Sequence, residues 1–174
     1  MVLRIISLIF VCVCVELNAQ QFISNNGIVS FYSETPLENI SAVNKNVSAA
    51  YDLASSDLVF QLDIKKFIFP IALMQEHFNE NYLESDIYPK SKFIGRVVNI
   101  IDEQATVSGD LTIHGITNSI KMVGSFIKSK NSVLINSKFI IKLKDYNIKI
   151  PKIVMYKIAE EIEVKVNIEL IELK

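Results

Sequence analysis

The pattern of apolar and polar residues predicts a chain made mainly of β-strands. In residues 57–65, Leu58, Phe60 and Leu62 alternate with Gln61 and Asp63. Alternation with a period of two is typical of a strand that buries one face. The same alternation recurs over residues 92–97, 106–113, 135–143 and 161–170, and further segments of strand-like composition are 27–33, 46–53 and 118–128. The sequence therefore predicts about eight strands.

Turn-forming residues separate several of these segments. They are Asn25-Asn26-Gly27, Ser55-Ser56-Asp57 and the stretch 128–132. Strands with one apolar and one charged face must close into a barrel or pair as a sandwich around one core. A closed barrel of eight strands is just wide enough for its own side chains or for one small ligand. A barrel of the outer-membrane type would turn its apolar faces toward lipid. It is disfavoured, because the polar faces carry many alternating Lys and Glu residues, the strands are short and no aromatic girdle is evident.

One segment departs from the strand pattern and predicts a short amphipathic helix over residues 70–82. Ile71, Met74, Phe78 and Tyr82 are spaced by three, four and four positions, which places them on one helical face. Pro70 suits the beginning of a helix. Such a helix could close one end of a barrel. Its apolar face would then either pack as ordinary core or contact a ligand.

Composition and the N-terminal residues narrow the class of protein. Half of the 174 residues are hydrophobic and the formal net charge is −1, which argues against intrinsic disorder and against a nucleic-acid-binding protein. Residues 1–19 combine a basic start with an apolar run and read as a signal peptide cleaved after Ala19. We therefore expect a single domain over 20–174, in the periplasm or secreted. Cys12 and Cys14 both fall in the signal peptide, so we expect no disulfide in the mature chain.

The sequence carries no recognisable catalytic or metal-binding motif. Its two histidines are His77 and His114. His77 and Glu80 are three apart on the predicted helix, but two ligands alone do not make a metal site. His114 precedes Gly115 and is expected to be a turn residue whose ring bonds to the backbone. We therefore expect no catalytic residue, no metal and no cofactor.

Three blocks of sequence resemble a known family. Residues 108–116 read Ser-Gly-Asp-Leu-Thr-Ile-His-Gly-Ile, residues 74–95 hold spaced Met, Phe, Tyr, Ser, Tyr-Pro and Phe-Ile-Gly elements, and residues 144–151 end in Ile-Pro. Together they resemble the YceI-like, or polyisoprenoid-binding, family in its short secreted form, over roughly residues 25–172. The resemblance implies an antiparallel eight-stranded lipocalin-like β-barrel with a short helix at one end. It also implies an elongated channel for isoprenoid-type or fatty lipids, and no catalytic residues.

The strand faces and the helix together supply a candidate channel wall. Apolar residues on the faces predicted to point inward, and those of the helical stripe, are the expected lining; the alternative for each is a side chain in a filled core. The wall candidates are Phe60, Leu62, Met74, Phe78, Tyr82, Phe93, Val97, Leu111, Ile113, Phe139 and Ile141. The candidates for the channel mouth are His114, Tyr88 and Tyr146.

The leading functional hypothesis is a protein that binds, sequesters or carries one long-chain hydrophobic molecule, such as an isoprenoid, a quinone-like molecule or a fatty lipid. An apolar channel gains about 25 cal/mol for each Å² of ligand surface removed from water. Contact with a membrane would be transient, and the family resemblance makes a homodimer an option. One alternative is a protein-interaction module with a filled barrel. Another is an enzyme acting on a lipid with His77 or His114 as its base.

Overall fold

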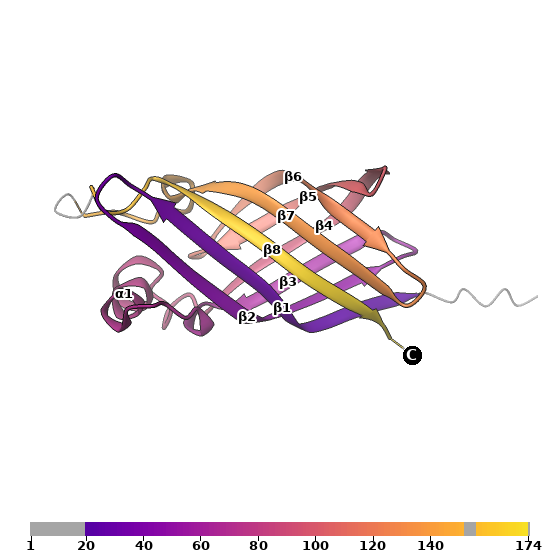
Figure 1. Cartoon of the computed structure of the whole chain (residues 1–174), viewed down its shortest axis with the longest axis horizontal. Coiled ribbons are helices and arrows are strands. Elements are labelled where there is room, and N and C mark those ends of the chain that lie inside the picture. The colour runs from indigo at the N-terminus through magenta and orange to yellow at the C-terminus, as the bar shows by residue number, and fades with distance from the viewer. Residues whose placement is uncertain (1–19, 152–155, 174) are drawn as a thin grey trace, which may run out of the picture.

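The computed structural model describes residues 20–151 and 156–173, and eight strands dominate it (Figure 1). The strands are β1 (Gln21–Glu34), β2 (Asn39–Asp52), β3 (Asp57–Asp63), β4 (Lys90–Ile101), β5 (Gln104–Ile113), β6 (Ile116–Lys128), β7 (Ser132–Lys142) and β8 (Glu161–Glu172). The helical elements are η1 (Ile64–Lys66), α1 (Ala72–His77), η2 (Phe78–Tyr82) and η3 (Leu143–Tyr146). None of the helices in the described residues is long and apolar enough to span a bilayer.

The strands form a closed antiparallel barrel. Each strand pairs with the next along the chain, and β8 pairs with β1, so the order around the barrel is the order in the sequence. The predicted fold class, an all-β antiparallel barrel of eight strands, is thus confirmed, and a barrel rather than a sandwich is the outcome. One end of the barrel carries α1 and the turn between β1 and β2, and the last described residue lies at the other end (Figure 1). We call the end with α1 the helix end, and the opposite end, where β8 finishes at Glu172, the closed end.

The turn predicted at Asn25-Asn26-Gly27 is wrong, because these residues form a β-bulge inside β1. The register of β1 against β2 shifts between Ser24 and Gly27 and again before Val29. A bulge adds a residue to one strand and interrupts the alternation without ending the strand. A side chain at position 27 would lie 2.6 Å from Ile168, so glycine also allows β8 to approach β1 closely. Strand β1 therefore begins at Gln21, before the predicted start at residue 27.

Other predicted boundaries also shift. Strand β2 begins at Asn39 instead of residue 46, because its inner face includes the fully buried Asn44, which hides the apolar alternation. Strand β3 ends at Asp63, and η1 follows where the sequence predicted continued strand. The predicted helix over 70–82 is split into α1 and the π-helical turn η2, with Ile71 as N-cap and Pro70 outside.

The closed end is filled by packed aromatic rings. Phe22 is fully buried, and its ring lies 6.3 Å from that of Tyr51, which in turn lies 5.1 Å from the ring of Phe126 in an edge-on arrangement. Aromatic pairs at such spacings contribute beyond their buried area. Burial raises the pKa of the Tyr51 phenol, against the opposing effect of a hydrogen bond with the Ser56 side chain. The rings of Phe22 and Tyr51 thus form a neutral, solid floor for the barrel.

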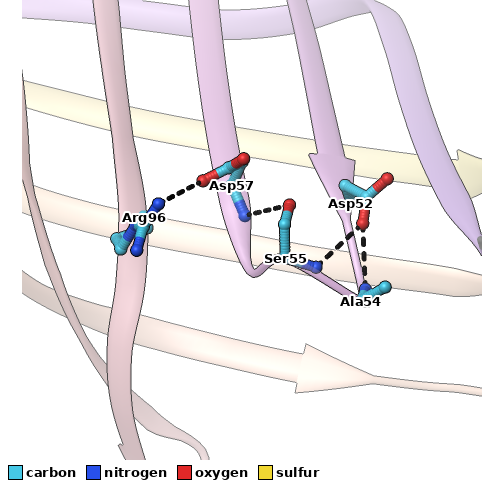
Figure 2. A network of polar contacts seen from close by, with 5 residues as sticks. All are labelled: Asp52, Ala54, Ser55, Asp57 and Arg96. Carbon is cyan, nitrogen blue, oxygen red and sulfur yellow. Dashed lines mark hydrogen bonds and ion pairs between the residues drawn. The ribbon is translucent and has the colours of Figure 1, made fainter.

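A polar network holds the β2–β3 turn against β4 (Figure 2). Asp52 accepts hydrogen bonds from the backbone N–H groups of Ala54 (2.9 Å) and Ser55 (3.0 Å). The Asp57 N–H donates to Ser55 Oγ (3.2 Å), and Arg96 Nη2 donates to Asp57 Oδ1 (3.2 Å). The hydrogen bond from the Ser55 N–H makes the largest contribution to lowering the pKa of the Asp52 carboxyl, and the bond from the Gln21 side chain makes the next largest. The ionised carboxylate therefore stabilises this turn.

We expect Asp52→Ala to lower stability at neutral pH and to have a much smaller effect in acid. A lowered folded-state pKa contributes stability above the ordinary pKa of the group and loses it as the pH falls through the folded value. Urea unfolding of both proteins at neutral and acidic pH measures the difference. Asp52→Asn is the matched control, since it keeps an acceptor for the turn without the charge. A destabilisation by Asp52→Ala that is equally large in acid would contradict the assigned role of the carboxylate.

Candidate ligand-binding cavity

A cavity of about 590 Å³ occupies the barrel from the helix end inward. This volume lies within the range of known small-molecule sites. Apolar side chains dominate its lining, and they come from the inner faces of the strands and from the segment between β3 and β4. Ten of the eleven predicted wall residues line it: Phe60, Leu62, Met74, Phe78, Tyr82, Phe93, Leu111, Ile113, Phe139 and Ile141. That any of them contacts a ligand stays a prediction.

Val97 is the predicted wall residue that does not line the cavity. It faces inward as predicted and is buried, but it lies at the closed end, where its N–H donates to the Ser56 carbonyl of the β2–β3 turn (2.9 Å). Val107, its partner on β5, does line the cavity, so the position of Val97 along the barrel does not explain the difference. Phe93 lines the cavity, and Val97 packs in the hydrophobic core beside it.

Four phenylalanine rings anchor the helical cap inside the barrel mouth. Phe78 of η2 lies 5.5 Å from Phe31 of β1, in a stacked arrangement, and 4.9 Å and 5.6 Å from Phe69 and Phe67. All four line the cavity. Sequence reasoning missed Phe31, Phe67 and Phe69. The available signal was the apolar run Phe67-Ile68-Phe69, just before the helix.

The mouth at the helix end carries a small set of polar groups. Lys157 Nζ lies 3.6 Å from Glu38 Oε2, and this ion pair links the β1–β2 turn to the segment before β8. Both residues line the cavity, together with His77 and the buried Ser33. The Ser33 hydroxyl is already engaged, because it accepts a hydrogen bond from the Ala159 N–H (2.9 Å). Sequence reasoning did not place Glu38, Lys157 or His77 at the mouth.

The three predicted mouth residues lie together, but outside the cavity lining. His114 is buried, its Nε2 lies 2.8 Å from Glu84 Oε2, and its Nδ1 lies 3.2 Å from the carbonyl oxygen of Tyr146. The ring of Tyr88 packs edge-on at 4.6 Å. The expected backbone bond of His114 is thus present. The cluster joins the β5–β6 turn, η3 and the segment after η2, and its side chains pack against one another outside the cavity lining.

Glycine at position 115 makes the cluster possible. Its φ is +74°, a value that glycine adopts without strain, and a Cβ there would lie 2.6 Å from the Tyr88 ring.

Burial raises the pKa of Tyr146 in this cluster and also the pKa of Tyr82 on the cavity wall. Both phenols are therefore neutral at neutral pH, and Tyr82 offers the cavity an uncharged hydroxyl.

Within residues 20–151 and 156–173, no three His, Cys, Asp or Glu side chains are grouped to hold a metal ion. His114 has a carboxylate partner, Glu84, but the His114 side chain does not line the cavity. His77 lines the cavity, and the described residues give it no hydrogen-bonded carboxylate that would orient its ring.

A closed antiparallel barrel of eight strands around an apolar cavity, with a helical cap at one end, defines a lipocalin-like barrel. The sequence profile of the YceI-like domain matches residues 24–170, and the chain belongs to this family. No curated protein matches the sequence.

Solved structures share the fold at low sequence identity. A polyisoprenoid-binding domain from Saccharophagus degradans, described as implicated in plant cell wall breakdown, has a TM-score of 0.75 at 12% identity, over 90% of this chain and 100% of that one. BcnA of Burkholderia cenocepacia has a TM-score of 0.73 at 16% identity, over 82% and 95%. The YceI protein of Campylobacter jejuni has a TM-score of 0.63 at 20% identity, over 75% and 83%.

Proposed function

We propose that this protein binds one long-chain hydrophobic molecule inside its barrel and sequesters or carries it without chemical change. The observation that supports this most directly is the cavity of about 590 Å³ with an apolar lining. It favours a binding protein over an interaction module with a filled barrel. An isoprenoid, a quinone-like molecule and a fatty lipid all fit an apolar wall with a few polar groups at its mouth.

The polar mouth also bears on the ligand's head group. Glu38 and Lys157 neutralise each other, so the mouth offers hydrogen bonds without a strong net charge.

We propose that the mature protein is the single domain 20–174, exported after cleavage following Ala19, and that it acts between membranes with at most transient contact to them.

Native mass spectrometry of the exported protein, followed by organic extraction, tests these points together. We expect the mass of residues 20–174 plus a long-chain lipid that is released by the solvent. The same spectrum reports whether the protein is a monomer or a homodimer. A bare protein mass that persists after incubation with fatty acids and quinones would contradict the binding function. A retained N-terminal segment would contradict the proposed export.

A further inference from the structure

Strands β6 and β7 are paired along less than half of their length. Their register runs from Lys128↔Val133 to Gly124↔Ser137 and stops there. Beyond that point β6 stays paired with β5 as far as Ile116, and β7 stays paired with β8 as far as Lys142. The two strands therefore part from each other while each remains held on its other side. We call the unpaired stretch, residues 116–123 of β6 and 138–142 of β7, the seam.

The cavity reaches the outer surface where the seam begins. Met122, Val123, Gly124 and Ser125 all line it. Successive residues of a strand point to opposite faces of a sheet, so a cavity that touches four in a row passes through the barrel wall. The outward side chain of Val123 is 58% exposed, and Ile140, across the seam, is 52% exposed. The outer margin of this opening therefore carries one apolar residue on each strand, and each is flanked by an exposed lysine, Lys121 on β6 and Lys138 on β7.

Side chains rather than backbone pairs close the seam. Continuing the register beyond Gly124↔Ser137 would set Met122 opposite Phe139 on the inner face. Both are partly buried against the core, and both line the cavity. Among the described residues, two side-chain hydrogen bonds bridge the seam at its ends: Ser137 Oγ to the Val123 carbonyl (3.1 Å) and Asn118 Nδ2 to the Asp145 carbonyl of η3 (2.7 Å).

The junction between β2 and β3 is also incompletely paired, but it is closed differently. There the backbones of Val43 and Ile68 exchange hydrogen bonds of 3.1 Å and 2.9 Å. Asn44 Nδ2 also donates to the Asp63 carbonyl (2.9 Å). Opening that junction would break backbone hydrogen bonds, whereas opening the seam requires rotation of side chains, one of them a flexible methionine.

We propose that the seam is a lateral portal, through which the apolar chain of the ligand enters and leaves the cavity between β6 and β7 as Met122 and Phe139 move apart. The proposal rests on the proposed function, since it concerns the route of the same ligand. Entry at the seam leads an apolar chain past Val123 and Ile140 onto the cavity-lining side chains of Met122 and Phe139. The alternative route at the helix end passes the Glu38–Lys157 ion pair and the Phe31, Phe67, Phe69 and Phe78 rings.

Cross-linking the seam tests the portal. In the full-length chain with Cys12→Ser and Cys14→Ser, Lys121→Cys and Ile140→Cys place thiols on the outer face of β6 and β7, and a bismaleimide joins them. The matched control is Lys121→Cys with Ser108→Cys, which joins β6 to its hydrogen-bonded partner β5. The probe is cis-parinaric acid, a fluorescent fatty acid, and its association and dissociation are followed by stopped-flow fluorescence before and after cross-linking.

We expect the seam cross-link to slow both association and dissociation by about tenfold or more, because it blocks the gating motion, while the equilibrium affinity changes little. The control cross-link should leave both rates unchanged. Probe binding with unchanged rates in the cross-linked seam variant would overturn the portal and leave the binding function standing. Failure of the protein without cross-links to bind the probe or any other long-chain lipid would overturn the binding function and the portal with it.

Discussion

Replacing Leu111 by tryptophan is expected to abolish binding of a long-chain lipid while the barrel stays folded. Leu111 is buried on the inner face of β5, between Phe93 of β4 and Asn118 of β6, and it lines the cavity. An indole there would take space from the ligand. Excluding about four methylene groups removes about 3 kcal/mol of binding free energy, which is more than about a hundredfold in affinity. The open cavity beside Leu111 should keep the cost of overpacking near the low end of about 1–3 kcal/mol.

Ser108→Trp is the matched control for this substitution. Ser108 lies on the same strand but is exposed on its outer face. An indole there should change neither lipid content nor fold. Extracted lipid is quantified by mass spectrometry, and urea unfolding reports the stability of both variants. Full lipid content in a folded Leu111→Trp protein would show that the ligand does not lie in the barrel interior.

The strands could be predicted from the sequence because inner and outer positions alternate so regularly in a barrel. Prediction from this alternation failed in β1, where a bulge interrupts the pattern. Asn25, Asn26 and Gly27 have the local chemistry of a hairpin turn, and a bulge uses the same residues. Only pairing with β2 and β8 on either side distinguishes the two, and that pairing depends on residues far away in the sequence.

The site could be predicted in part, since alternation reveals which residues of a strand face inward but not which of them border the cavity. Phe93 and Val97 share a face, and yet Phe93 lines the cavity and Val97 packs in the core beside it. Glu38 and Lys157 were missed because they lie outside the strands, in segments without periodicity, and meet only in the folded chain. His114 was expected at the mouth, but its ring bonds to Glu84 and to the Tyr146 carbonyl and does not line the cavity.

Removing the Tyr51 ring from the floor of the cavity is expected to change both the stability of the barrel and the length of ligand that it prefers. Tyr51 is 3% exposed and does not line the cavity, but its ring packs edge-on against that of Phe126, which does. We expect Tyr51→Ala to extend the cavity toward the closed end and to lower the free energy of unfolding by about 3–5 kcal/mol, the usual cost of removing a buried aromatic ring. The added volume should favour longer ligands, with about 0.8 kcal/mol of binding free energy gained for each further methylene buried.

Tyr51→Phe separates the ring from its hydroxyl. It keeps the floor intact and removes the hydrogen bond with Ser56, so we expect a loss of about 0.5–1.5 kcal/mol in stability and no change in the preferred chain length. Affinities for a series of saturated fatty acids, measured alongside urea unfolding, compare the two variants. Because the alanine variant weakens the fold but enlarges the site, stability and long-chain affinity should change in opposite directions. A preferred chain length that is the same in Tyr51→Ala and Tyr51→Phe would mean that the ligand's chain does not reach the floor formed by Tyr51 and Phe22.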